Sequence, residues 1–290
     1  MGERPASVGK AVCDARGDAA EAHLIPDYGM VAEQVMTRET AGDTDRWVLL
    51  PGTLCTDRVF DPLLDNLRIR HGNRRFVAVD APDVRDFGAR LKAAVTGGEI
   101  VCGFSLGALV LAHNLGVLGA ARALVLLACS PFPDPPGNRA NREAVRDRVL
   151  GGDARGWISE NWTAMSAVHD TALRDFVVSM AESTTDLITA QTELAASRPS
   201  SEKLLKDTVL PLVFVTGSED GLTPADPIRE IVAGAKLAHL SVVEGLGHFA
   251  LIEAPERVAA AVRVGLEAVA PTSTLDRQLQ EKRDHTSLAS

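Results

Sequence analysis

The sequence predicts an α/β fold with a mostly parallel central sheet that is flanked by helices. Six short apolar runs end at or near Gly, Pro, Asp or Ser and cover residues 47–50, 76–79, 100–104, 123–128, 212–217 and 240–245. Runs of this kind are typical of parallel strands that are buried on both faces. Segments with apolar residues three and four positions apart, as in helices that pack on a sheet, cover residues 84–96, 106–118 and 255–269. This mixture of strands and helices indicates the α/β class.

One long stretch interrupts the alternation. Residues 132–206 contain no convincing strand and hold amphipathic segments at 138–150, 154–165, 171–182 and 186–197. We interpret this stretch as a helical lid between two parts of the core, residues 29–131 and 207–270. The ends of the chain, residues 1–28 and 271–290, have the composition of loosely ordered tails.

Charge and composition limit the possible partners. The chain has 290 residues, of which 46% are hydrophobic, enough for a sizeable core. Its formal charge is −9 at pH 7, and it has no basic stripe. Binding of nucleic acid phosphates needs clustered Lys and Arg, so we expect no nucleic acid partner. Composition and charge leave the oligomeric state undecided, and a homodimer is one possibility.

Cysteine usage and hydropathy favour a cytoplasmic protein. The four cysteines lie far apart without a CxxC pair, so they predict neither a zinc site nor a disulfide framework: Cys13, Cys55, Cys102 and Cys129. The first 30 residues hold no apolar run like that of a secretory signal. The longest apolar stretch, residues 107–128, contains His113, Asn114 and Arg122, so we expect no membrane span.

The pentapeptide GFSLG at residues 103–107 predicts a nucleophilic serine. It joins an apolar strand to a helical segment, and a Gly-x-Ser-x-Gly sequence in that setting presents its serine at the carboxyl end of a sheet. Ser105 would also lie at a helix N-terminus, where free N–H groups favour developing negative charge. The alternative is a glycine-rich turn with an incidental serine.

A serine nucleophile needs a base and a carboxylate that orients the base. Asp220 follows one predicted strand, and His248 follows the next, so the chain order is Ser, Asp, His. Glu219 and Asp134 are alternative acids, although Asp134 lies between two prolines and is more typical of a turn.

From Trp47 to Val269 the sequence resembles the α/β-hydrolase fold superfamily, in particular its lidded esterase and proline-iminopeptidase-like branch. Four motifs carry the resemblance: LLPGT, GFSLG, GSEDGLTP and GLGHFALIEAPERV. The resemblance implies the α/β-hydrolase fold and favours Asp220 over Glu219 as the acid. Serine at position 105, where carboxylate-dependent members have aspartate, argues against dehalogenase and epoxide hydrolase chemistry.

Two backbone N–H groups are expected to stabilise the oxyanion of a tetrahedral intermediate. One belongs to Leu106, directly after the nucleophile. By the family's motif the other belongs to Thr53, which follows Gly52. The sequence departs from the family's pattern in two places. Pro51 stands where many members have His. The glycine-rich loop that usually follows residues 76–83 is missing, and its absence predicts a more open pocket on that side.

Aromatic residues indicate an apolar substrate pocket. Phe104 and Phe249 are neighbours of the predicted catalytic residues, and the helical stretch contributes Trp157 and Trp162. The alternative for the two tryptophans is that they form the core of the helical stretch itself.

The sequence therefore predicts a serine hydrolase that cleaves a carboxylic ester or thioester of a small-molecule substrate through an acyl-enzyme, without cofactor or metal. Two alternatives remain: an acyltransferase with the same three residues, and a non-catalytic ligand-binding protein on the same fold. Fold alone does not separate these functions.

Overall fold

A computed structural model of the chain describes residues 45–270. The predicted tails, residues 1–28 and 271–290, and the first part of the predicted core, residues 29–44, lie outside the described residues.

Six parallel strands form one sheet in the order β2-β1-β3-β4-β5-β6. They are β1 (Trp47–Leu50), β2 (Arg74–Phe76), β3 (Ile100–Phe104), β4 (Ala123–Leu127), β5 (Leu212–Gly217) and β6 (Ala238–Val243). The four central strands are buried along their whole length, as their continuous apolar runs require. The predicted parallel sheet flanked by helices is confirmed.

The two edge strands differ from the prediction. The predicted strand at residues 76–79 is wrong in its bounds, because β2 covers Arg74–Phe76 and is largely exposed. The strand predicted at 240–245 begins two residues earlier, and β6 is mostly half-buried. An edge strand has one neighbour only and tolerates polar residues, so a search for continuous apolar runs misplaces its ends.

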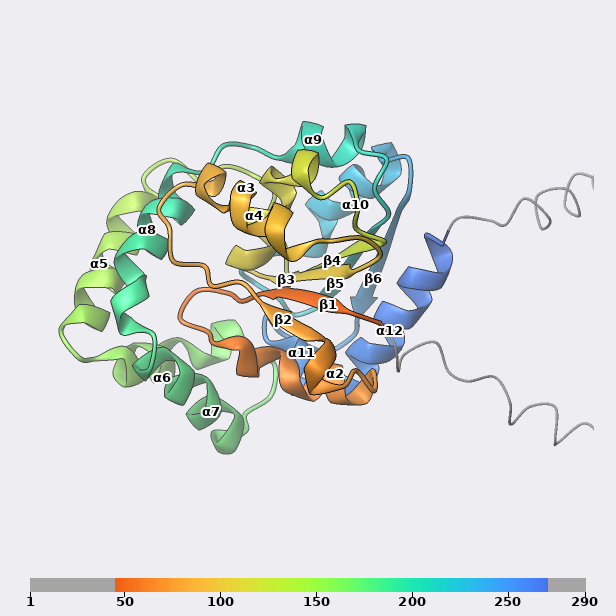
Figure 1. Cartoon of the computed structure of the whole chain (residues 1–290). Helices are drawn as coiled ribbons and strands as arrows, with labels where there is room; N and C mark the ends of the chain where they lie inside the picture. The colour runs from red at the N-terminus through yellow and green to blue at the C-terminus, as the bar shows by residue number, and fades with distance from the viewer. Residues whose placement is uncertain (1–44, 271–290) are drawn as a thin grey trace, which may run out of the picture. The chain divides into compact units, whose positions relative to one another are not determined.

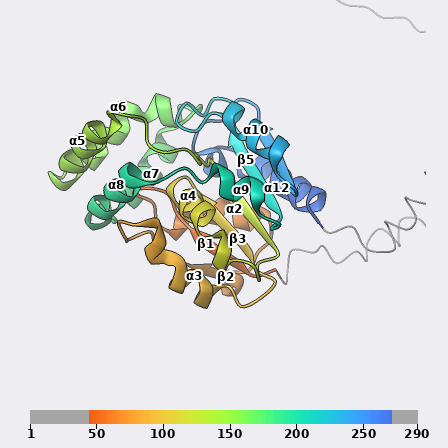
Figure 2. The same cartoon turned by 90° about the horizontal axis from the view of Figure 1, so that it is seen from above.

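Helices cover both faces of the sheet (Figures 1 and 2). One face carries α3 (Gly88–Ala94), α4 (Leu106–His113), α9 (Glu202–Asp207) and α10 (Ala225–Gly234), and the other carries α2 (Asp61–Asn66), α11 (Ala250–Glu253) and α12 (Pro255–Ala268). The helix predicted at 84–96 starts with a 3-10 turn at Val84–Phe87. The one predicted at 106–118 ends at His113, and the Asn114 side chain that follows donates to the Val110 carbonyl.

The four predicted helical segments after β4 are all helices: α5 (Asn138–Leu150), α6 (Ala154–Met165), α7 (Thr171–Glu182) and α8 (Ile188–Ser197). Side chains of Asp153 and Asp170 accept from free N–H groups at the starts of α6 and α7, which explains where these helices begin. The four helices lie together at one end of the sheet, at the left of Figure 1. We call residues 132–206 the helical insertion.

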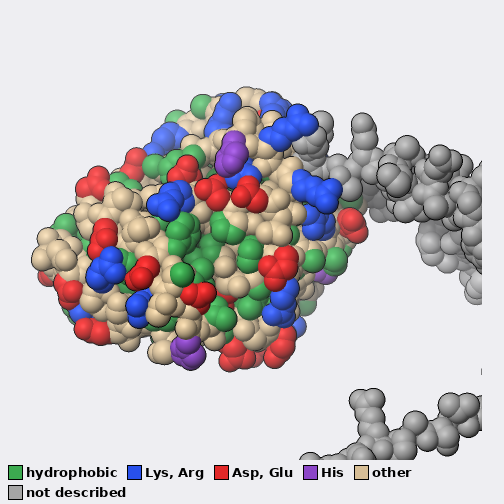
Figure 3. All heavy atoms as spheres, turned by 90° about the horizontal axis from the view of Figure 1, so that it is seen from below, with side chains coloured by type: hydrophobic (Ala, Val, Ile, Leu, Met, Phe, Trp, Pro, Cys, Tyr) green, Lys and Arg blue, Asp and Glu red, His purple; other side chains and the backbone are tan. Residues whose placement is uncertain are grey.

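The surface mixes charges of both signs. On the face drawn in Figure 3, acidic and basic side chains are interspersed, and hydrophobic side chains gather near the middle. Many surface arginines are paired; Arg148, for example, bonds both Asp153 and Glu160. Exposed pairs of this kind contribute little to stability, because water and salt screen them. Within residues 45–270, no helix has both the length and the apolar character needed to cross a membrane.

Candidate active site

Ser105 lies at the sharp turn between β3 and α4. Its φ of 51° and ψ of −112° are unusual for a residue with a side chain. The turn depends on the glycines on either side. A Cβ at Gly103 would lie 2.5 Å from the Ala108 nitrogen, and one at Gly107 would lie 2.1 Å from the Leu50 oxygen. The conformation leaves Ser105 partly exposed at the carboxyl end of β3.

A continuous chain of hydrogen bonds joins Ser105, His248 and Asp220. Ser105 Oγ and His248 Nε2 are 3.0 Å apart, and His248 Nδ1 is 2.9 Å from Asp220 Oδ2. Because a carboxylate only accepts, Nδ1 carries the proton and Nε2 is left to accept from the serine hydroxyl. The structure therefore brings together the three residues that the sequence assigns to nucleophile, base and acid.

The carboxyl of Asp220 is held in its ionised form. Burial by itself would raise its pKa, but hydrogen bonds from His248 and Thr223 outweigh burial and lower the pKa to about 2. The backbone N–H groups of Leu222 and Thr223 each donate to Oδ1 at 2.9 Å, and the Thr223 hydroxyl bonds Oδ2. Asp220 is thus a fixed negative charge beside the imidazole at any pH well above 2.

The alternative acids lie elsewhere. Glu219 is exposed, and its side chain accepts from the Ser218 hydroxyl at 3.2 Å. Asp134 forms ion pairs with Arg142 and Arg198 at the start of the helical insertion. Neither carboxylate bonds His248, so of the three candidate acids Asp220 is the one that is hydrogen-bonded to the imidazole.

The loop after β1 passes directly beside Ser105. A Cβ at Gly52 would lie 3.2 Å from the Ser105 Cβ, so the loop could not approach this closely with a larger residue. Within residues 45–270, the backbone N–H groups of Thr53 and Leu106, the two predicted oxyanion donors, bond no protein acceptor. The next N–H, that of Leu54, donates to Gln191 Oε1 of α8 at 3.0 Å. Sequence reasoning missed Gln191, because one glutamine in an amphipathic helix carries no signal.

The loop that carries His248 is fixed from two sides. The His248 N–H donates to the Met165 carbonyl at the end of α6 at 2.9 Å. The preceding Gly247 N–H donates to Glu253 Oε2 at 2.8 Å, and burial raises the pKa of this carboxyl. Glu253 belongs to the motif around His248, but no sequence pattern assigns it a role. The Met165 contact uses a backbone carbonyl, which no sequence pattern marks.

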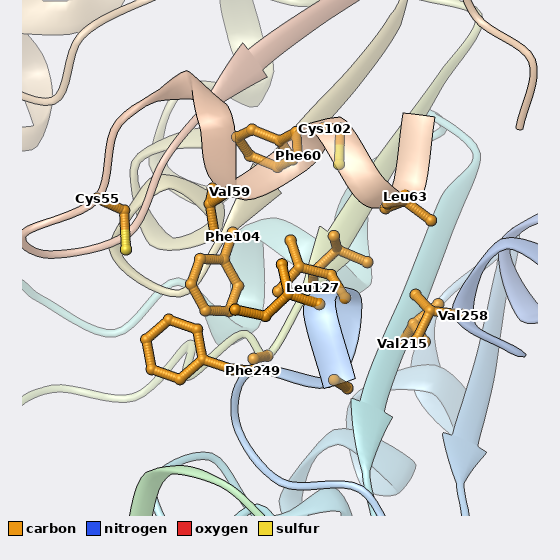
Figure 4. Packing of buried hydrophobic residues seen from close by; sticks show 14 of the residues in the cluster. Cys55, Val59, Phe60, Leu63, Cys102, Phe104, Leu127, Val215, Phe249 and Val258 are labelled. Atoms are coloured by element: carbon orange, nitrogen blue, oxygen red, sulfur yellow. The ribbon is translucent and has the colours of Figure 1, made fainter. Parts of the chain in front are cut away.

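Aromatic rings surround the histidine. The centroid of the Phe104 ring lies 5.2 Å from that of the His248 ring, and the centroid of the Phe249 ring lies 5.8 Å from it. The two phenylalanine rings are tilted by 49° to each other, and they lie next to each other in Figure 4. Trp162 stacks on Phe249 at 6.1 Å, whereas Trp157 is half-buried against the hydrophobic core and has no ring contact with the site. A small apolar cavity lies behind His248, between Phe104, Val215 and the imidazole.

The described residues offer no group of three or more His, Cys, Asp or Glu that could hold a metal ion. The three cysteines among them are buried and form no disulfide: Cys55, Cys102 and Cys129.

Comparison with known proteins identifies the family of the chain. Residues 47–261 match the model of a family described as "Alpha/beta hydrolase family". Similar solved structures include an esterase from Thermogutta terrifontis, with 19% identity and a TM-score of 0.67 over 79% of this chain and 92% of that chain.

An esterase from Exiguobacterium antarcticum is also similar, with 15% identity and a TM-score of 0.64 over 78% of this chain and 93% of that chain. A bromoperoxidase from Bacillus anthracis has 15% identity and a TM-score of 0.63 over the same shares, 78% and 93%. No curated protein matches the sequence. At these identities the likenesses show the fold.

Proposed function

The chain belongs to the alpha/beta hydrolase family, and on that premise we propose that it is a serine hydrolase that cleaves a carboxylic ester or thioester. The observation that carries the proposal is the unbroken hydrogen-bond chain from Ser105 Oγ through His248 to the buried, ionised Asp220. A serine hydroxyl is a weak nucleophile by itself, and this arrangement is the one that activates it.

The reaction follows from the positions of the proton and the charges. Ser105 Oγ attacks the carbonyl carbon while its proton passes to His248 Nε2, and the carbonyl electrons move onto the oxygen. The backbone N–H groups of Thr53 and Leu106 stabilise that oxyanion. When the tetrahedral intermediate collapses, the alcohol or thiol leaves with the proton from His248, and the acyl group stays on Ser105. Water then attacks in the same way and releases the acid.

An apolar acyl or alcohol part suits the surroundings of the site. Phe104 and Phe249 contact the His248 ring, and Trp162 extends this aromatic group into the helical insertion. We assign the helical insertion the role of a lid that separates the reacting ester from water. Exclusion of water strengthens each electrostatic interaction in the site.

The direct test compares the wild type with Ser105→Ala on a nitrophenyl ester. We expect Ser105→Ala to lose turnover and to resist labelling by a fluorophosphonate, since both need the Oγ nucleophile. Ser241→Ala, on strand β6, removes a hydroxyl that among the described residues bonds only His239, and it should behave as wild type. Undiminished turnover by Ser105→Ala would contradict the proposal. Products formed in the presence of added alcohols distinguish hydrolysis from acyl transfer.

A further inference from the structure

Resting on the proposed function, we propose that Gln191 is a positioning residue for the oxyanion hole. It lies in the helical insertion, outside the motifs that carry the family resemblance, and it does not bond Ser105, His248 or Asp220. Its role is to fix the loop at residues 52–55, which carries the predicted donor Thr53.

The contacts of Gln191 join three segments that are far apart in the sequence. Its side-chain Oε1 accepts from the Leu54 N–H at 3.0 Å, and its Nε2 donates to the Val79 carbonyl at 2.9 Å. The backbone groups dictate the orientation of the amide, because only its oxygen can accept from an N–H and only its nitrogen can donate to a carbonyl. Gln191 is 1% exposed, so water does not compete for either bond.

Leu54 needs such a restraint. Its φ of 56° is a left-handed conformation that residues with a side chain rarely adopt. Conformations of this kind persist where the surrounding structure over-determines them. The hydrogen bond from the Leu54 N–H to Gln191 is one such restraint, and it acts one residue after Thr53. A loop that relaxed at Leu54 would also turn the Thr53 peptide.

The hydrogen bond from Gln191 to the Val79 carbonyl explains why a residue of α8 can hold the loop after β1. The loop after β2 lacks the glycine-rich segment that the family resemblance implies, and the sequence predicts an open pocket there. In the structure α8 reaches this loop, since Gln191 bonds the carbonyl of Val79. The same side chain therefore ties the loops after β1 and β2 to the helical insertion. Gln191 acts on the oxyanion hole through the loop and does not itself contact the substrate.

Gln191→Met tests this role, because methionine keeps the length and volume of the side chain but can neither accept from Leu54 nor donate to Val79. Displacement of one oxyanion donor should lower kcat roughly 10- to 100-fold. The KM should change little, and the pH dependence of kcat should stay that of the wild type, because the bonds among Ser105, His248 and Asp220 are untouched. Binding of a trifluoromethyl ketone, which forms an oxyanion on Ser105, should weaken by a similar factor.

Asn114→Leu provides a matched control. Asn114 is likewise a buried amide, and it donates to the carbonyls of Val84 and Val110, away from the oxyanion loop. Both variants should unfold at lower denaturant concentration than the wild type, but only Gln191→Met should lose kcat per folded molecule. If Gln191→Met retains wild-type kcat and ketone affinity, its amide is only structural and the proposal is wrong.

Hydrogen exchange in the wild type tests the contact without any substitution. The Leu54 amide should exchange as slowly as the amides of the central strands; exchange as fast as in an unprotected loop would overturn the proposal even if Gln191→Met fails to fold. Comparison with Ser105→Ala distinguishes failure of the positioning role of Gln191 from failure of the proposed hydrolase mechanism. Loss of turnover in Ser105→Ala with normal kcat in Gln191→Met contradicts the positioning role alone, whereas normal turnover in Ser105→Ala contradicts the hydrolase mechanism.

Discussion

The backbone N–H of His248 donates to the carbonyl of Met165, the last residue of α6, at a distance of 2.9 Å. The helical insertion is therefore joined directly to the loop that carries His248. A displacement of α6 would break this bond and shift the imidazole relative to Ser105. Together with the bond between Gln191 and Leu54, this contact makes the insertion part of the framework of the site.

Trp162 connects the same end of α6 to the aromatic rings around His248. Its indole N–H donates to the Val168 carbonyl at 3.1 Å, and its ring stacks on Phe249. Trp162→Ala should reduce the free energy of unfolding by about 3–5 kcal/mol, the usual cost of deleting a buried tryptophan. It should also increase kcat/KM for esters with bulkier acyl groups relative to acetate, because the cavity opens beside Phe249.

Trp157→Ala in the same helix is the control for Trp162→Ala. Trp157 is half-buried and has no ring contact with the site, so its loss should cost less stability and leave the acyl preference unchanged. Denaturant unfolding and a series of nitrophenyl esters measure the two effects. Equal acyl preferences in the two variants would mean that Trp162 does not border the substrate.

The choice of acid is tested by replacing each of the three candidate carboxylates, Asp220, Glu219 and Asp134, with its amide. Asp220→Asn should lower kcat by about 10⁴-fold, since the amide no longer accepts the Nδ1 proton in the required tautomer. Glu219→Gln should leave kcat unchanged, because this side chain is exposed and does not reach His248. Steady-state kinetics on one ester compares them.

Asp134→Asn should lower the free energy of unfolding without changing kcat. Asp134 and Arg198 form an ion pair whose side chains are 5% and 7% exposed, so removal of the charge leaves the Arg198 guanidinium buried without a counter-charge. A loss of about 3–5 kcal/mol of unfolding free energy is expected, with kcat per folded molecule unchanged. A large fall in kcat for this variant with normal kcat in Asp220→Asn would reverse the assignment of the acid.

The sequence allowed prediction of the parts of the fold that depend on local pattern. The central strands are buried on both faces and thus appear as continuous apolar runs, and Ser105 is marked by glycines that the turn requires for steric reasons. The edge strand β2 is mainly polar and exposed, so its bounds had no apolar signal. Gln191 and Met165 act through contacts to backbone groups of distant loops, and only the folded chain reveals which loops they meet.

The pKa of Asp220 predicts how stability changes in acid. Its pKa in the folded protein is about 2, below the ordinary value of 3.8. The folded state therefore binds this proton less tightly than the unfolded state, and the resulting stabilisation, about 2 kcal/mol, is complete above pH 4 and is lost as the pH falls through 2. Asp220→Asn lacks this contribution, so the stability difference from wild type should shrink between pH 4 and pH 2.

Glu253 predicts a pH dependence of the opposite sign. Burial raises the pKa of this carboxyl above its ordinary value of 4.5, so the folded state binds the proton more tightly than the unfolded state does. The stabilisation that this provides is complete below pH 4.5 and is lost as the pH rises through the folded pKa. Glu253→Gln keeps an oxygen for the Gly247 N–H without the buried charge. Its stability relative to wild type should thus increase from pH 4 to pH 8 in urea unfolding. A constant difference between Glu253→Gln and wild type would mean that the carboxyl is ionised in the folded protein as readily as in the unfolded chain.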